Sequence, residues 1–269
     1  MKSKLILALA CLGCLTPAAR SDDAQNAAAR KIFNEKKDCV VYVSAIAKTS
    51  FSGNSAKDTP LNLPDQESKV ESLGTLIDTS GLVVTVLGQL DPGRNITGRS
   101  VRTAQGVVKV EASSTLKEVK VIMPDGTEIP AEIVMKDADL DLAFVRINPG
   151  SKEAKGVTFQ AVDLKDSAPG EILDETVTLT RMDEVLNRTP SVARGQINNI
   201  TKKPRTFLRA GGAVGGCPTF LANGKILGIT AGRTLTGKTP WAVIIPAADV
   251  LEIADQAKSS PPAPEKAAK

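Results

Sequence analysis

Two short motifs in the sequence place chemically useful side chains at spacings known from enzymes. Residues 232–239 read G-R-T-L-T-G-K-T, which matches the loop that cradles nucleotide phosphates. That loop works because a helix begins at its lysine and points backbone amides at the phosphates. Here Pro240 follows directly and disfavours helical backbone at Thr239, and the strand-like run 241–245 comes next. The motif therefore predicts a polar loop between two strands, and no nucleotide ligand is expected.

The second motif is Ser114–Lys117, which matches the S-x-x-K motif of penicillin-recognising enzymes. That chemistry requires a helix that places the lysine beneath the serine, together with separate K-T-G and S-D-N motifs. The sequence contains neither of these partner motifs. We therefore interpret the match as chance.

Histidine is absent from all 269 residues of the chain. A Ser-His-Asp or Cys-His centre needs an imidazole that accepts and returns a proton near neutral pH. Zinc sites that depend on histidine are excluded for the same reason. The sequence thus excludes most familiar hydrolase mechanisms, and we expect neither a metal nor another cofactor.

The N-terminus has the features of an export signal. Two lysines precede the apolar run 5–15, which is too short to span a bilayer, and small residues follow. We expect a signal peptide over residues 1–19, with cleavage after Ala18 or Ala19. The mature protein would then be periplasmic or secreted, without a transmembrane span. Attachment to lipid through Cys14, as in a lipoprotein, is the less favoured alternative.

Cleavage would leave Cys39 and Cys217 as the only cysteines. In an oxidising compartment, two cysteines far apart in the sequence can form one disulfide. Two buried free thiols are the alternative, because unpaired cysteine is among the most buried residue types. The sequence favours neither arrangement over the other.

The composition is that of a folded protein with a nearly neutral surface. Hydrophobic residues make up 42% of the chain and charged residues 24%. Removal of Lys2 and Lys4 with the signal leaves 32 basic residues against 30 acidic ones, a net charge of +2. Aromatic residues account for only 3%, too few for a platform on which bases stack. Binding to nucleic acid is therefore not expected.

Most of the chain consists of short segments, rich in β-branched residues, that are separated by turn signals. The segments in which we expect strands are 39–47, 73–90, 106–110, 118–137, 141–147, 175–182, 191–200, 219–230 and 241–247. Helices are expected over 20–37 and 247–257, and the Pro/Ala/Lys-rich residues 258–269 are expected to be a disordered tail. Short strands with a helix only near each end predict an all-β barrel or sandwich.

Four segments, in this order, resemble the trypsin-like serine proteases, especially the HtrA/Deg branch. Residues 211–229 (GGAVGGCPTFLANGKILGI) are similar to the family's G-N-S-G-G loop and the strand that follows it. Residues 73–85 and 121–147 resemble the strands that lead to its histidine and aspartate, and 241–254 resembles its last strand and helix. The resemblance covers most of residues 38–256.

This resemblance implies two β-barrels of the six-stranded type, over about 38–148 and 157–247, within one domain that spans 38–257. The two barrels are expected to meet at a cleft. Since the chain ends about a dozen residues after this domain, no PDZ-like second domain is expected.

Carried over residue by residue, the family's catalytic triad falls on Gly88, Asp141 and Val214. Glycine cannot act as a base, and valine cannot attack a carbonyl carbon, so only the aspartate is retained. The family's oxyanion loop falls on Gly212, Ala213 and Val214. The resemblance therefore implies an inactive protease homologue that binds a protein or an extended peptide in the cell envelope.

Two other functions remain open at this stage. An active endopeptidase would need another nucleophile, either Cys217 or a Ser-Lys pair. Cys217 follows the Gly-Gly turn, which is expected to point its thiol into the barrel, away from any substrate. The other possibility is a purely structural protein of the cell envelope.

Overall fold

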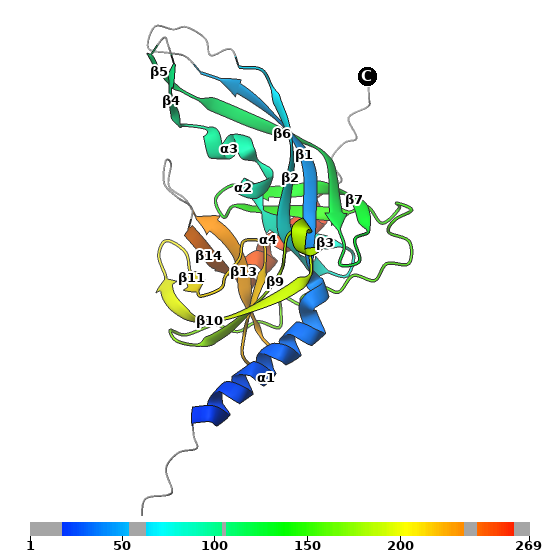
Figure 1. The fold of residues 1–269 in the computed structure, drawn as a ribbon, viewed down its shortest axis with the longest axis vertical. Helices are drawn as coiled ribbons and strands as arrows, with labels where there is room; N and C mark the ends of the chain where they lie inside the picture. Colours follow the sequence, from blue (N-terminus) through cyan, green and yellow to red (C-terminus); the bar gives the residue numbers. More distant parts are fainter. Residues whose placement is uncertain (1–17, 54–62, 104–105, 234–240, 261–269) are drawn as a thin grey trace, which may run out of the picture.

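The computed structural model describes residues 18–53, 63–103, 106–233 and 241–260 (Figure 1). Its elements, in chain order, are α1 (Ala18–Lys36), the 3-10 helix η1 (Lys37–Cys39), β1 (Val40–Ser52), β2 (Gln66–Asp78), β3 (Leu82–Val86), α2 (Leu87–Leu90), α3 (Pro92–Ile96), β4 (Ser100–Thr103), β5 (Gly106–Lys109), β6 (Glu111–Ile122), β7 (Glu128–Asp137), β8 (Leu142–Ile147), β9 (Glu175–Arg181), the 3-10 helix η2 (Glu184–Leu186), β10 (Pro190–Thr201), β11 (Phe207–Ala210), β12 (Pro218–Leu221), β13 (Ile226–Arg233), β14 (Trp241–Pro246) and α4 (Ala247–Ser259).

Twelve of the strands form two closed six-stranded barrels, as predicted. The strand order is β1-β2-β3-β8-β7-β6 in the first barrel and β10-β11-β14-β13-β12-β9 in the second. The remaining strands, β4 and β5, form a separate two-stranded sheet. A helix lies at each end of the described chain, so the all-β class with an N-terminal and a C-terminal helix is confirmed.

The barrels share a core in addition to their own interiors. Val40 on β1 is buried in the shared core, whereas Val41 and Val43 are buried inside the first barrel. Successive residues of a strand point to opposite faces, so β1 is covered on both sides. The same double burial explains why β3 is almost entirely apolar, with Thr85 as its one polar residue and all of its residues buried. The shared core also includes residues of the second barrel, among them Phe220 and Ile229.

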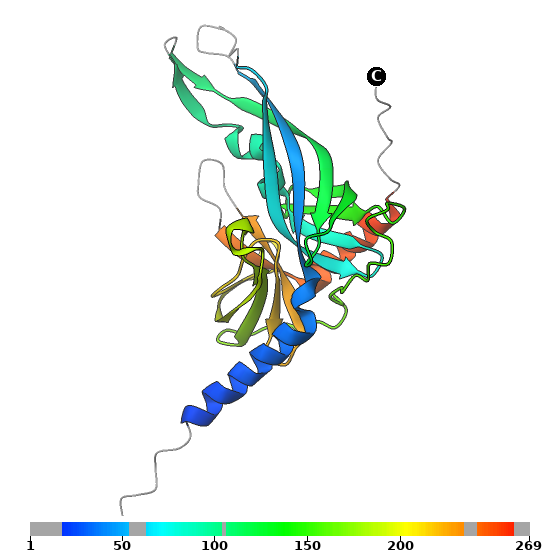
Figure 2. The ribbon, with the colours of Figure 1, turned by 45° about the vertical axis from the view of Figure 1, so that its right-hand side comes forward.

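Several segments differ from the predicted elements, and β4 and β11 form where no strand was predicted. Residues 87–90, predicted as the end of a strand, form the single-turn helix α2, in which the amide of Asp91 donates to Leu87 O (3.0 Å). Parts of residues 49–68, predicted as a polar loop, continue β1 and β2. These strands extend beyond the barrel together with β6, and they end near β4 and β5 (Figure 2). Because the extension is largely exposed, polar residues can occupy it without a burial cost.

The C-terminal helix continues past its predicted end at 257. It reaches Ser259 because Arg146 Nη2 donates to the carbonyl oxygens of Ala257 (2.8 Å) and Lys258 (3.2 Å). Lys258 Nζ also lies 2.8 Å from Asp78 Oδ2 on the first barrel. The first residues of the predicted tail are therefore helical, and the rest of that prediction lies outside the described residues, as does most of the predicted signal peptide.

A buried arginine on β9 joins the two barrels. The Arg181 residue is only 6% exposed, and its Nε donates to Val40 O on β1 (2.6 Å). Its Nη1 donates to Arg188 O (3.1 Å), and its Nη2 lies 3.1 Å from Asp38 Oδ1. One largely buried guanidinium therefore supplies donors to both barrels.

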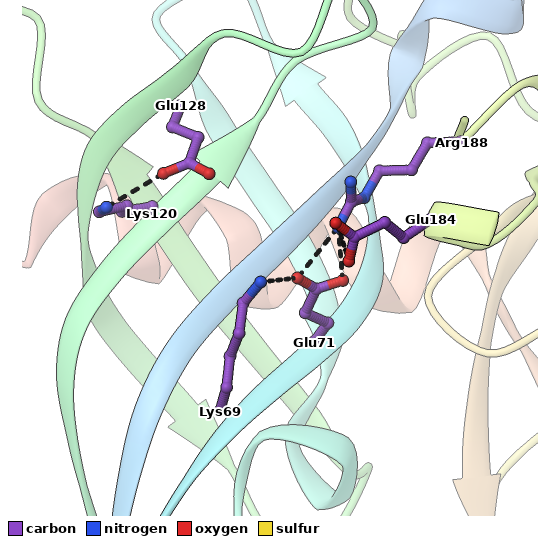
Figure 3. Close-up of polar contacts among 6 residues, drawn as sticks. All are labelled: Lys69, Glu71, Lys120, Glu128, Glu184 and Arg188. Carbon is purple, nitrogen blue, oxygen red and sulfur yellow. Dashed lines mark hydrogen bonds and ion pairs between the residues drawn. The ribbon is translucent and has the colours of Figure 1, made fainter. Parts of the chain in front are cut away.

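The turn between β9 and β10 continues this contact at the surface. Arg188 Nη2 pairs with the Glu71 carboxylate on β2, at 3.1 Å and 3.0 Å from its two oxygens (Figure 3). Lys69 Nζ lies 2.7 Å from the same carboxylate, and Glu184 lies 3.4 Å from Arg188 (Figure 3). The Arg188 guanidinium also lies over the Tyr42 ring, 5.3 Å from its centroid. This network of ion pairs thus connects the second barrel to β1 and β2 of the first barrel.

We expect Arg181→Met to lower the free energy of unfolding by about 3 kcal/mol, because the buried Val40 O would lose this donor and the contacts to Arg188 O and Asp38 would be lost as well. Urea denaturation at neutral pH measures the change. The exposed Arg99 provides a control, since Arg99→Met should stay within about 0.5 kcal/mol of the parent. Equal losses for the two variants would contradict the role of Arg181.

Candidate functional site

Gly88 and Asp141, the predicted positions of a lost histidine and a retained aspartate, lie against each other. Val86 and Leu142 are cross-strand partners at the ends of β3 and β8, so the residues just beyond them meet. Gly88 N donates to Asp141 Oδ1 (2.8 Å). Leu87 N donates to Asp141 O (2.9 Å), which fixes Asp141 in a left-handed conformation with φ of 59°. Aspartate tolerates this conformation better than most residues.

A side chain at position 88 would point at the Asp141 carboxylate. A Cβ atom built on Gly88 would lie 3.1 Å from Asp141 Oδ1 and 3.5 Å from Oδ2. Asn95 on α3 also faces this position, and its Nδ2 donates to Gly88 O (2.7 Å). The backbone therefore places position 88 where the Asp141 carboxylate could orient a basic side chain, although glycine supplies no base.

Asp141 now serves as an acceptor for backbone and arginine. Its side chain is 16% exposed, and Arg94 Nη1 lies 3.6 Å from Oδ1. Burial raises the pKa of the Asp141 carboxyl, while the amides of Gly88 and Gly232 and the Arg94 charge oppose that rise. Since Gly232 belongs to β13, this carboxylate interacts with both barrels.

Val214, the predicted nucleophile position, lies in the loop between β11 and β12. Its side chain is half-buried and packs against the shared core. A Cβ atom built on the neighbouring Gly215 would lie 3.2 Å from Gln89 Nε2 and 3.2 Å from Val86 Cγ2. Gln89 directly follows Gly88, so the structure brings the three predicted positions into one region. A cleft lined by them remains a prediction.

The predicted oxyanion loop has unused donors. Its Val214 O accepts from Cys217 N (3.1 Å), which closes a turn. Within the part of the chain that the structure describes, nothing accepts a hydrogen bond from the amides of Gly212, Ala213 or Val214. Three consecutive amides are thus available to an external acceptor.

The loop is held against the first barrel by a contact between backbones. A Cβ atom on Gly216 would lie 1.9 Å from Leu73 O on β2, and its φ is 79°. Thr75 Oγ1 donates to Gly216 O (2.7 Å), and Gly216 N donates to Thr230 O (2.8 Å). Only glycine satisfies both the close approach and the positive φ.

Cys39 and Cys217, the two cysteines among the described residues, are buried and are not joined to each other. Burial raises the pKa of Cys39, and the nearby Cys217 adds to that rise. Burial also raises the pKa of Cys217, to about 12. Since a nucleophilic cysteine must ionise and be accessible, neither thiol is suited to attack a substrate.

The other motifs assemble no chemistry among the described residues. Ser114 and Lys117 lie on β6, where three-residue spacing places them on opposite faces. Ser114 Oγ lies 2.9 Å from Thr49 Oγ1, and Lys117 Nζ lies 3.6 Å from Glu67. Gly232 and Arg233 of the predicted polar loop end β13, and residues 234–239 lie outside the described ranges.

Two absences apply to the described ranges alone. They contain no group of three or more Cys, Asp or Glu side chains that could hold a metal ion. They also contain no helix long and apolar enough to cross a membrane.

Two residues of α3, Arg94 and Asn95, surround Asp141, and sequence reasoning missed both. A signal was present, because Asp91 followed by Pro92 is a typical helix start. The Asp91 side chain does accept from Arg94 N (3.1 Å), which caps α3.

Comparison with known proteins assigns this architecture. Residues 74–229 match the family model of the trypsin-like peptidase domain. The serine endoprotease from Yersinia pestis is a similar solved structure, with 14% identity, a TM-score of 0.53 and coverage of 85% of this chain and 66% of that one. The MamO protease domain from Magnetospirillum magneticum (apo form) aligns with 15% identity, a TM-score of 0.48 and coverage of 82% and 98%. No curated protein matches the sequence.

We expect Gly216→Ala to destabilise the protein by about 3 kcal/mol more than Gly224→Ala. Both glycines have a positive φ, 79° and 86°, but a Cβ on Gly224 would meet nothing within 4 Å. Both variants lose about 1 kcal/mol because alanine disfavours a positive φ. The difference between them therefore measures the steric overlap of the new Cβ with Leu73 O. Thermal or urea unfolding of the two variants measures the difference, and equal losses would contradict the contact.

Proposed function

The chain belongs to the trypsin-like peptidase domain family, and we propose that it is a member without peptidase activity that binds an extended polypeptide. The observation that carries the proposal is the pair of residues at the positions of base and nucleophile. Gly88 and Val214 occupy these positions, and the sequence contains no histidine that could substitute from elsewhere. Acyl transfer by the family mechanism needs both groups.

The environment of the remaining reactive groups supports loss of catalysis. Asp141 binds the Gly88 amide and lies beside Arg94, so its carboxylate stabilises backbone in place of an imidazole. Cys217, the most plausible substitute nucleophile, is fully buried. Its thiol has a pKa of about 12 because of this burial, so the thiolate is scarce at neutral pH.

One feature supports binding of extended main chain. The unpaired amides of Gly212, Ala213 and Val214 can donate to a peptide carbonyl. Main-chain groups of this kind recognise a polypeptide without requiring a particular sequence.

The predicted signal peptide over residues 1–19 supports an exported protein. We therefore place the binding function in the periplasm or outside the cell, with a protein of the envelope as the partner. This placement and the identity of the partner are parts of the proposal.

Purified protein should fail to cleave fluorescently labelled, unfolded casein, and Val214→Ser should fail equally, because a restored hydroxyl still lacks a base. The release of soluble fluorescence measures cleavage, with trypsin as the positive control. Activity of the parent chain that survives repeated purification would overturn the proposal. Replacement of Cys217 by serine would then be the first step toward locating the nucleophile.

Binding is tested separately on an array of overlapping peptides from unfolded proteins. We expect retention of the labelled chain by a subset of these peptides, because main-chain donors act on any extended segment. Retention by none of them would contradict the binding function and favour a purely structural role.

A further inference from the structure

One face of the second barrel changes from apolar to cationic along its length. The strands β11, β14 and β13 are neighbours in that order. On one face they bury Phe207, Val243 and Ala231 in the shared core. Side-chain direction repeats every second residue, so the residue two positions from each of these points to the same face. These residues, all at the same end of the barrel, are Arg209, Trp241 and Arg233. We call Arg209, Trp241 and Arg233 the arginine–tryptophan patch.

Trp241 is the exposed centre of this patch. It is 59% exposed and pairs across the ladder with Arg233 of β13. On its other side, Arg209 Cζ lies 4.3 Å from the centroid of the indole ring. Tryptophan and arginine are enriched among the residues that carry the binding energy of protein interfaces.

Both guanidinium groups are oriented by aromatic rings. Arg209 lies over Trp241, and Arg233 Cζ lies 4.9 Å from the centroid of Phe207. Stacking uses the face of a guanidinium and leaves its in-plane N–H donors available for bidentate contact with a carboxylate. Arg233 Nη1 donates to the carbonyl of Asp139, which fixes its position further and occupies only part of its donors.

Neither arginine forms an ion pair with a carboxylate in the ranges that the structure describes, although the Arg233 charge also acts on the Asp141 carboxyl. Arg94, Arg181 and Arg188, by contrast, each form such an ion pair. Two oriented guanidinium groups beside an exposed indole are complementary to carboxylates carried on an extended chain.

We propose that the arginine–tryptophan patch binds acidic side chains of an extended peptide. Arg209 and Arg233 each pair with one carboxylate, and Trp241 packs against the peptide between them. The inference rests on the proposed polypeptide-binding function and adds a preference for peptides with acidic side chains. The adjacent loop agrees with it, since Gly212 and its unpaired amide follow Arg209 by three residues.

The spacing of the strands suggests the arrangement of the acids. Neighbouring strands lie about 4.8 Å apart, so β11 and β13, on either side of β14, are separated by about 10 Å. Residues i and i+2 of an extended peptide lie on one face about 7 Å apart, a distance that flexible arginine side chains can bridge. We therefore expect a Glu-x-Glu pattern to bind well.

The chain itself provides the probe, since Trp241 is its only tryptophan. Titration with a Glu-x-Glu peptide should change the intrinsic fluorescence in a saturable manner. The same peptide with glutamine in place of glutamate should bind at least tenfold more weakly. Added salt should weaken binding of the acidic peptide but not of the glutamine peptide, because salt screens the ion pairs.

Two variants and a control assign the effect to the patch. Arg209→Gln and Arg233→Gln should each raise the Kd for a labelled acidic peptide at least tenfold, as measured by fluorescence anisotropy. Arg102→Gln, at an exposed position on β4, should leave the Kd unchanged. Unchanged melting temperatures would show that the variants remain folded.

The outcomes separate this inference from the function on which it rests. Equal binding of the glutamate and glutamine peptides, or no effect of either arginine substitution, would overturn the acidic specificity and leave polypeptide binding intact. Tighter binding of a single-stranded oligonucleotide or of anionic vesicles than of the acidic peptide would also overturn it. Failure of every peptide to bind would overturn both proposals.

Discussion

The contact between the backbones of Gly216 and Leu73 determines how the two barrels fit together. No side chain can occupy position 216, because a Cβ there would overlap Leu73 O at 1.9 Å. This approach holds the loop that carries Val214 against β2, and so places it beside α2 and Gly88. Arg181 and the shared core stabilise the same interface from the other side. The positions at which a protease would do chemistry are thus set by residues that take no part in chemistry.

This separation means that the fold does not depend on which side chains occupy the positions predicted for the catalytic triad. Asp141 receives the Gly88 amide and lies beside Arg94, so its carboxylate is compensated even though no imidazole is present. Val214 packs against the shared core, where a serine hydroxyl would contribute less apolar contact. Both arrangements stabilise the fold without an imidazole or a hydroxyl at these positions. The proposed binding function would use the unpaired amides of the loop and the arginine–tryptophan patch.

The sequence predicted elements that depend on local signals and missed contacts that depend on strand register. The P-D-G run at 124–126 is a local hairpin signal, and it joins β6 and β7 with Thr127 N donating to Asp125 Oδ1 (2.9 Å). The burial of Arg181 was not predictable, because its acceptor Val40 O is 141 positions away. Likewise, Arg209 and Trp241 meet only because β11 pairs with β14. Neither strand alone indicates which residues of the other will face it.

The most direct measurement of the central claim is the mass of the native protein after prolonged exposure to a fluorophosphonate that reacts with activated serines. The account predicts an unchanged mass, because the chain has no histidine to activate a hydroxyl and Val214 replaces the nucleophile. The reagent should modify a matched amount of trypsin completely under the same conditions. Stoichiometric addition of one phosphonyl group to the folded chain, at any residue, would contradict the account.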